Sequence, residues 1–344
     1  MAKLLITGGA GFIGSHFIRY WLEEHPGDSI TNLDALTYAA SPESLRDIED
    51  NPHYTFVHGN ICDTDLVNQL VSDVEVIIHF AAETHNDRAI TNLKPFIETN
   101  VRGTHVLLEA VKQKDIHFHH ISTDEVFGHL ELGSNKKFTE NTPYYPRMPY
   151  AATKAASDHL VRSYYETHKL PITITNCSNN FGSYMNPEKF IPRMITNLID
   201  GQPVKIYGDG KYVRDWLYVR DHARAIDAIL QSGKTGETYL VGGMEKDVNN
   251  LEVAQMIVEY MFGPAAAKAP AGDPESRIKF VKDRPGHDRR YAVDWSKIQR
   301  ELGWEPQHSF EEWLKTTVGW YKENESWWRP LKEESEKMYA QSGQ

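Results

Sequence analysis

The fold is decided by the stretch KLLITGGAGFIG, residues 3–14. Its first part, Lys3–Thr7, is a short apolar run of the kind that forms a buried strand. The glycine-rich segment Gly8–Gly14 follows, and residues 15–24 then show the apolar spacing of a helix. Glycines allow a tight turn and a close backbone approach, and the N-terminus of the following helix attracts a pyrophosphate. The order strand, turn and helix therefore indicates dinucleotide binding.

A second predicted strand, residues 29–34, ends in Asp34, twenty residues after Gly14. An acidic side chain at this distance can accept hydrogen bonds from the ribose hydroxyls of a dinucleotide. A carboxylate would repel a 2′-phosphate, and no Arg follows Asp34 immediately, so NAD is favoured over NADP. Glycine patterns also occur in plain turns, but a strand that ends in an acid at this spacing makes dinucleotide binding the better interpretation.

The alternation of strands and helices continues to about residue 176. Further strands are predicted at residues 54–58, 74–80, 116–122 and 171–176, with helices at 66–71, 96–112 and 150–168. Such alternation predicts an α/β fold, a Rossmann-like doubly wound parallel sheet with right-handed crossovers. Ligands of these sheets lie beyond the carboxyl ends of the strands. Small or polar residues stand at six predicted strand ends: Gly8, Asp34, Asn60, Ala81, Thr123 and Asn176.

The second half of the chain changes character after about residue 180. Short strands at 204–207 and 238–241 are mixed with helices at 191–198, 223–230 and 251–262. We therefore predict a Rossmann-like domain over residues 1–180 and a smaller α/β C-terminal substrate lobe, mainly residues 181–330. A segment near 212–242 is expected to return to the first domain. Residues 331–344 are polar and are expected to form a frayed tail.

Composition excludes several classes of function. The chain of 344 residues carries 37 basic and 48 acidic side chains, a net charge of −11, which disfavours binding to nucleic acid. No apolar run approaches the ~18 residues of a membrane-spanning helix. Only Cys62 and Cys177 occur, so a disulfide framework is not expected. A chain that opens directly on a strand-like run, without a signal peptide, is expected to be cytoplasmic.

Two clusters of polar residues lie near the predicted rim of the sheet. Thr123, Asp124 and Glu125 offer adjacent acid and base groups, and Tyr150 and Lys154 place a phenol and an ammonium on one helix face. Each cluster alone has an ordinary explanation, a solvated loop or an exposed helical pair. Together, after a dinucleotide fingerprint, they indicate a site that moves protons and a hydride. Lys154 and the nicotinamide charge are expected to lower the pKa of Tyr150.

Histidines near this rim could suggest a metal site. His117, His119 and His120 lie on a predicted strand without a matching carboxylate pattern, so we interpret them as core or surface side chains and expect no metal. No Gly-x-Ser-x-Gly motif occurs, which disfavours a serine hydrolase.

With these motifs in place, the chain resembles the extended short-chain dehydrogenase/reductases, and within them the dTDP-glucose 4,6-dehydratase family. The shared segments span nearly the whole chain: TGGAGFIG at 7–14, DALTY at 34–38, FAAE at 80–83, STDEV at 122–126, Tyr150 with Lys154, CSNN at 177–180, PEK at 187–189, YGDG at 207–210, RDW at 214–216 and DRPGHDRRY at 283–291. The sequence departs from the family's usual pattern at a few positions. Asn60 stands where Asp is usual, Thr84 where Ser is usual, Asn86 where Val or a similar residue is usual, and Asn176 where Arg is usual. The loop SYMN at 183–186 also differs from the usual segment.

The resemblance implies an NAD-dependent lyase that removes water from a nucleotide sugar. Tyr150 would take the proton of the C4 hydroxyl, with Lys154 supporting it, and Thr123 would hydrogen-bond the C4 oxygen. Glu125 would then remove the C5 proton while Asp124 protonates the leaving C6 hydroxyl. The two carboxyl groups would have to hold different protonation states, as neighbouring carboxyls tend to do.

The resemblance also implies binding residues and an assembly. A homodimer would form through the helices at 96–112 and 150–168. NAD would be bound by Gly8, Gly11, Phe12, Ile13, Gly14, Asp34, Ala35, Leu36, Thr37, Asn60, Ile61, Phe80, Ala81, Ala82, Thr84, Thr99, Tyr150, Lys154 and Asn179. The nucleotide-sugar substrate would be bound by Thr84, Thr123, Asn180, Glu188, Lys189, Lys205, Tyr207, Arg214, Asn249, Arg284 and His287. Arginines suit a diphosphate because their planar guanidinium groups bind its oxygens in pairs.

Three alternatives stay open at this point. The same chemistry could act on a UDP-sugar. A C4-epimerase would use Tyr150 and Lys154 but has no need of Asp124 and Glu125. A non-catalytic NAD-sensing module would need none of these four side chains.

Overall fold

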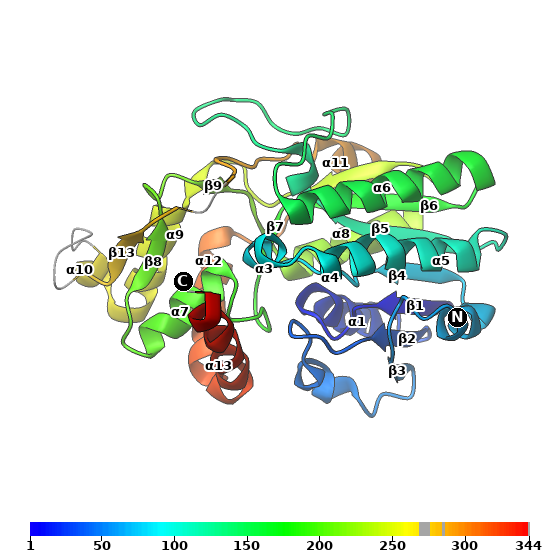
Figure 1. Ribbon diagram of the computed structural model, residues 1–344, viewed down its shortest axis with the longest axis horizontal. Coiled ribbons are helices and arrows are strands. Elements are labelled where there is room, and N and C mark those ends of the chain that lie inside the picture. The colour runs from blue at the N-terminus through cyan, green and yellow to red at the C-terminus, as the bar shows by residue number, and fades with distance from the viewer. Residues whose placement is uncertain (268–275, 284–285, 343–344) are drawn as a thin grey trace.

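The computed structural model describes residues 1–267, 276–283 and 286–342 (Figure 1). Its centre is a seven-stranded sheet with the strand order β11-β6-β5-β4-β1-β2-β3, in which each neighbouring pair is parallel. The predicted Rossmann-like doubly wound sheet is confirmed. The strands are β1 (Lys3–Thr7), β2 (Ser29–Asp34), β3 (Tyr54–His58), β4 (Val76–His79), β5 (His117–Thr123), β6 (Ile172–Cys177) and β11 (Thr238–Val241).

Helices cover both faces of this sheet. Successive side chains of a strand point to opposite faces, and β1 shows the pattern directly. Leu4 and Ile6 pack with buried residues of α1 (Phe12–Glu24) and α8 (Val219–Ser232). Leu5 packs on the other face, against α2 (Thr64–Leu70), α5 (Thr104–Val111) and α6 (Pro149–His168). The sheet is therefore buried on both sides, as its near-continuous apolar strands predict.

The predicted single helix over 96–112 is interrupted. It consists of α4 (Lys94–Phe96), a π-helical turn η3 (Ile97–Gly103) and then α5. Asn100, at the centre of the π turn, donates from Nδ2 to the Glu83 carbonyl at 3.0 Å and to Thr153 Oγ1 at 2.9 Å. Its Oδ1 accepts from the Glu83 N–H at 2.9 Å. These bonds join the loop after β4 to the helix α6.

Shorter elements complete the first lobe. They are η1 (Pro42–Ile48), η2 (Val71–Asp73), α3 (Asn86–Thr91) and η4 (Asp124–Phe127). Of these, η4 follows β5 directly, and α3 follows β4 after the segment 80–85.

The second lobe is built around its own apolar core, which includes Ile195, Val204, Ile257 and Trp328. It appears on the left of Figure 1, beside the carboxyl ends of the strands of the large sheet. Its elements are α7 (Phe190–Ile199), β8 (Val204–Tyr207), α9 (Asn250–Phe262), α10 (Pro264–Ala267), β13 (Ile278–Val281), α12 (Phe310–Glu323) and α13 (Glu325–Ser342). Two small ribbons stand between the lobes: β7 (Asn179–Phe181) with β10 (Trp216–Tyr218), and β9 (Val213–Arg214) with β12 (Val248–Asn249).

Two observations refine the expectations for the second half. β11 and α8 lie in the first lobe, in the segment expected to return there, and α11 (Ser296–Leu302) joins them. The frayed tail predicted after Pro330 is wrong for the described residues, because α13 runs through Pro330 to Ser342. Buried Trp328 and an ion pair of Lys332 with Asp200 at 2.6 Å hold this helix to the second lobe.

Candidate active site

The glycine-rich loop joins β1 closely to β4. Gly8 has φ +74°, and a Cβ there would stand 2.6 Å from the backbone of Ala81. A Cβ on Gly14 would stand 2.5 Å from the Gly8 carbonyl oxygen. Helix α1 begins without a side-chain cap and without an acidic residue in its first turn. Its uncapped N–H groups therefore fit the pyrophosphate of a dinucleotide.

Asp34, at the end of β2, is buried and faces the same loop. Its carboxylate accepts from the Ala10 N–H at 2.9 Å and from the Leu36 N–H at 2.8 Å. Burial raises its pKa, although these two bonds oppose the change. The carboxylate is held in place and keeps lone pairs for ribose hydroxyls, so these residues fit NAD.

The other predicted cofactor residues lie in several segments, and their contact with NAD stays a prediction. Asn60 uses its Oδ1 to accept from the Cys62 N–H at 2.8 Å, which fixes the turn after β3. The remaining positions are distributed over five segments: Ala35, Leu36 and Thr37 after β2, Ile61 after β3, Phe80, Ala81, Ala82 and Thr84 after β4, Thr99 in the π turn, and Asn179 in β7.

The acid pair follows β5 directly, in the short turn η4. Thr123 donates to Asp124 Oδ1 and accepts from the Glu125 N–H, each at 3.2 Å. Asp124 is 1% exposed, and its Oδ2 has no hydrogen-bond partner among the described residues. Burial and the neighbouring Glu125 raise the pKa of Asp124 well above its ordinary value. Asp124 is therefore set up to carry a proton.

Glu125 has a different environment. Burial raises its pKa, but a hydrogen bond from Asn86 and the positive charges of Arg214 and Lys189 oppose that change. Asn86 Nδ2 lies 3.0 Å from Glu125 Oε2. The two adjacent carboxyl groups therefore differ in the way that an acid and a base require.

Tyr150 and Lys154 lie in the first turns of α6, and both are buried. Burial raises the pKa of Tyr150 well above its ordinary value, and the charges of Glu125 and Asp124 add to this effect. In the chain itself, the shift of the Tyr150 pKa is thus opposite in direction to the predicted lowering. That prediction included the positive charge of the nicotinamide and stays a prediction for the protein with the cofactor bound.

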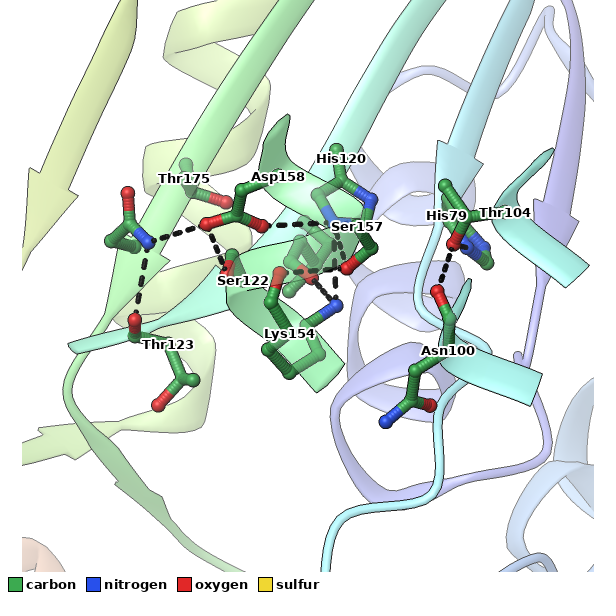
Figure 2. A network of polar contacts seen from close by, with 12 residues as sticks. His79, Asn100, Thr104, His120, Ser122, Thr123, Lys154, Ser157, Asp158 and Thr175 are labelled. Carbon is green, nitrogen blue, oxygen red and sulfur yellow. Dashed lines mark hydrogen bonds and ion pairs between the residues drawn. The ribbon is translucent and has the colours of Figure 1, made fainter. Parts of the chain in front are cut away.

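Lys154 belongs to a buried polar network (Figure 2). Its Nζ donates to the Ile121 carbonyl at 2.8 Å and lies 3.4 Å from His120 Nε2. His120 Nε2 is also 3.2 Å from Asp158 Oδ1. Burial lowers the pKa of Lys154 to about 8, although the charge of Asp158 opposes the change.

Asp158 is the anionic centre of this network. Its Oδ2 accepts from Ser122 and Tyr144 at 2.8 Å each and from Asn176 Nδ2 at 3.2 Å. Burial would raise its pKa, but the hydrogen bonds and the charges around it bring the pKa below its ordinary value. Asn176 also donates to the Thr123 carbonyl at 3.1 Å, so the network reaches the turn that carries the acid pair.

The sugar side of the site joins the two lobes. Lys189 Nζ lies 3.2 Å from both the carbonyl oxygen and Oγ1 of Thr84. Glu188, with a fully buried side chain, is paired with Arg88 at 3.0 Å. The Arg88 guanidinium also lies 3.6 Å from the centre of the Tyr38 ring. Glu188, which was predicted to bind the substrate, therefore forms an ion pair with Arg88 in the protein itself.

The nucleotide side contains Arg214, which lies 3.0 Å from His287 Nε2 and donates to the Asp288 carbonyl. The neighbouring Asp215 accepts instead from the backbone N–H groups of Gly243, Met244 and Val293, so an Arg214–Asp215 salt bridge is not the role of this pair. Arg214 and Asp215 line a cavity of about 300 Å³, together with Tyr291 and residues 133–135, 137, 244–247, 290 and 292.

The other predicted substrate residues vary in position. Tyr207 is near His287, with ring centres 6.1 Å apart. Asn180 hydrogen-bonds His222 at 3.0 Å, Lys205 is exposed on β8, and Asn249 caps α9 in a capping box with Glu252. Arg284 lies outside the described residues.

Four residues at the site were not anticipated: Arg88, Asn100, His120 and Asp158. Only Asp158 had a signal in the sequence, because it follows Lys154 by four residues and so shares its helix face. Of the histidines of β5, His119 and His120 are buried and His117 is half-buried. His119, for example, is 2.8 Å from Thr173 Oγ1, and burial lowers its pKa. Within the described residues, no group of three or more metal-binding side chains is found, and no helix is long and apolar enough to cross a membrane.

Comparison with known proteins places this geometry in a family. The family model described as GDP-mannose 4,6 dehydratase matches residues 5–317. A dTDP-glucose 4,6-dehydratase of Mycobacterium tuberculosis is 49% identical over 343 residues, which cover 99% of this chain and 100% of the relative. The same enzyme from Bacillus anthracis, solved with NAD, is 43% identical with a TM-score of 0.87 and covers 96% of this chain and 100% of the other.

A solved dTDP-glucose 4,6-dehydratase of Streptomyces venezuelae, also with NAD bound, is 43% identical. Its TM-score is 0.89, with 96% of this chain and 99% of the other covered. The match extends over both lobes and includes the segments that carry the acid pair and the Tyr150–Lys154 pair. The chain therefore belongs to the dTDP-glucose 4,6-dehydratase family of extended short-chain dehydrogenase/reductases.

Proposed function

We propose that the protein is an NAD-dependent lyase that converts dTDP-glucose to dTDP-4-keto-6-deoxyglucose. The observation that carries this proposal is the pair of buried Asp124 and half-buried Glu125 beside Tyr150. Glu125 and Asp124 are near enough to Tyr150 for their charges to raise its pKa. An enzyme that only inverts C4 has no use for two further carboxyl groups, whereas elimination of water needs an acid and a base.

The first step is removal of the proton from the C4 hydroxyl. Tyr150 accepts this proton, and Lys154, held by the Ile121 carbonyl, supplies positive charge to the phenolate. Thr123 Oγ1 hydrogen-bonds the C4 oxygen and polarises the ketone. Bound NAD would supply hydride chemistry, taking a hydride from C4 and returning it to C6, so that the cofactor is regenerated in each turnover.

The second step is loss of water between C5 and C6. The C4 ketone makes the C5 proton acidic, and Glu125 removes it. Asp124, whose raised pKa favours its protonated form, protonates the leaving C6 hydroxyl. Glu125 then returns a proton to C5.

Binding of the nucleotide sugar is proposed for the residues around the two lobes. Arg214 and His287 would contact the diphosphate, and Lys189 with Thr84 would contact the sugar end. Arg214 lies 3.0 Å from His287, and Lys189 lies 3.2 Å from Thr84. Each pair therefore forms a local polar surface that a charged or hydroxylated ligand can contact.

The function is tested by separate incubation with dTDP-glucose and UDP-glucose, without added NAD, and mass analysis of the products. Loss of one water from dTDP-glucose is the expected result. Loss of water from UDP-glucose alone would assign the other nucleotide. An unchanged mass with a new stereoisomer would identify an epimerase, and no turnover on either substrate would favour a sensor module.

A homodimer and a cytoplasmic location stay predictions. The helical segment expected at the dimer interface begins near three exposed apolar side chains, Ile90, Leu93 and Ile97. Their burial between two copies would remove apolar surface from water. Light scattering after size-exclusion chromatography should give twice the chain mass of 39.4 kDa, and a monomer mass would contradict the proposal.

A further inference from the structure

Asn86, the first residue of α3, contacts the proposed base of the reaction. Its Nδ2 lies 3.0 Å from Glu125 Oε2, although the two residues belong to different loops of the sheet rim. The resemblance gives Val or a similar residue at this position, which cannot form such a bond.

The helix does not need the Asn86 amide. The N-cap of α3 is His85, and Asn86 follows it. Oδ1 of Asn86 is buried and has no hydrogen-bond partner among the described residues. A buried acceptor without a partner costs free energy. The hydrogen bond of the Asn86 amide that the structure shows is therefore the one from Nδ2 to Glu125.

The chemistry of the two groups fixes the direction of the bond. An ionised carboxylate can only accept, so the amide must present its NH₂ group to Glu125. Hydrogen bonds of this kind favour the charged form of a carboxyl group. The bond also restricts rotation of the carboxylate and so fixes the lone pairs that receive a proton.

We propose that Asn86 is a positioning residue that holds the Glu125 carboxylate in one orientation as the proton acceptor for C5. The inference rests on the proposed function, in which Glu125 is the base. Asn86 does not touch the reacting atoms in this proposal and acts through Glu125 alone.

Several charged groups face Glu125 besides Asn86. Burial and the charge of Asp288 raise its pKa, while Arg214 and Lys189 lower it. Asp124, Tyr150 and Tyr291 also interact with its charge. Because these groups stay in place when Asn86 is replaced, the change in the Glu125 pKa on substitution reports the amide contribution.

The test compares Asn86→Val with Asn86→Thr, two side chains of nearly the same shape of which only Thr has a hydroxyl donor. The acidic limb of the pH profile of kcat/KM for dTDP-glucose should move to higher pH by about one unit in Asn86→Val. It should move less in Asn86→Thr. KM should change less than twofold, because Asn86 does not bind the substrate in this proposal.

A second measurement addresses the step itself. With dTDP-glucose deuterated at C5, the isotope effect on kcat should rise in Asn86→Val, since a less well placed base makes proton removal more rate-limiting. Asn86→Ala, which also lacks a donor, is measured alongside, so that the test stands even where Asn86→Val does not fold. Asn68→Val, an exposed position on α2, is the matched control and should leave both quantities at the wild-type value.

The outcomes separate the two proposals. Wild-type protein that does not dehydrate dTDP-glucose overturns the proposed function. A wild type that does so, with an acidic limb and isotope effect unchanged in Asn86→Val and Asn86→Ala, overturns the role of Asn86. A higher KM with an unmoved pH profile overturns it too, because that result assigns Asn86 to substrate binding.

Discussion

Lys154 and Asp158, one turn apart on α6, both lie against the same nitrogen of His120, at 3.4 and 3.2 Å from Nε2. All three side chains are buried. Burial lowers the pKa of His120 to about 4, so the imidazole is neutral at pH 7 and the network holds one positive and one negative charge. Figure 2 shows Asp158 beside Thr175 of β6. Asp158 thus balances the charge of Lys154 without occupying the site.

Replacing Asp158 with Asn should make the alkaline limb of the pH profile begin at lower pH. The charge of Asp158 raises the pKa of Lys154, which burial brings to about 8. Without that charge the ammonium loses its proton more readily, so activity is lost at a pH where the wild type still works. The pH dependence of kcat, measured from pH 6 to 9, checks this shift.

An exposed carboxyl provides the control for Asp158→Asn. Asp65→Asn on α2 should leave the alkaline limb in place. If Asp158→Asn lowers the rate equally at every pH, the carboxylate acts on folding or geometry and not on the charge of Lys154.

Glu125→Gln should separate oxidation from elimination. Gln cannot take the C5 proton, but Tyr150 and Lys154 remain to support oxidation at C4. Reduced nicotinamide should accumulate on the protein after dTDP-glucose is added, seen as absorbance near 340 nm. The rate at which the dehydrated product forms should fall by at least ~100-fold. Product formation at the normal rate would rule out Glu125 as the base.

The Arg88–Glu188 pair should contribute measurably to stability. Glu188 has a fully buried side chain, and Arg88→Met leaves its carboxylate without its cationic partner. We expect the free energy of unfolding to fall by about 3 kcal/mol, measured by urea denaturation at pH 7. Adding Glu188→Gln should recover part of this loss, because the double variant no longer buries an unpaired charge. A double variant that is less stable than Arg88→Met would contradict this explanation.

Acid should destabilise the fold through buried histidines. His222 on α8 has no exposed surface, and burial lowers its pKa from 6.5 to about 3. Between these pH values the unfolded chain binds the extra proton, so stability present above pH 6.5 is lost as the pH falls towards 3. His222 alone should cost about 2 kcal/mol between pH 7 and pH 5.

His222→Gln tests this by urea denaturation at both pH values. Gln can still bond Asn180, which lies 3.0 Å from His222 Nδ1, but it does not titrate. The variant should lose less stability than the wild type on going from pH 7 to pH 5. His105→Gln, at an exposed position on α5, should lose as much as the wild type.

Most strands of the large sheet could be predicted from the sequence to within two residues. Their apolar runs are continuous because both faces are buried, and small or polar residues mark their ends. The π turn around Asn100 could not be predicted, because apolar spacing continues through it and its cause is tertiary: the bonds to Glu83 and Thr153. The continuation of α13 past Pro330 could not be predicted either, because packing of Trp328 outweighs the usual helix-breaking effect of proline.

The proposed catalytic residues could be predicted because they are close in sequence and their chemistry is distinctive. The partners that tune them come from distant segments. Asn86 and Glu125 are 39 residues apart, and Arg88 and Glu188 are 100 apart. No local pattern encodes such a pair, so its existence depends on where the fold brings the two loops.

The position of β11 has a consequence for how the chain folds during synthesis. This strand closes the edge of the sheet beside β6, but it comes only at residues 238–241, after the first two elements of the second lobe, α7 and β8. A nascent chain that ends near residue 180 would expose the β6 edge, an unpaired row of backbone groups open to misassociation. The first lobe therefore cannot be completed on the ribosome before the second is under way. We expect both lobes to be acquired as one cooperative unit.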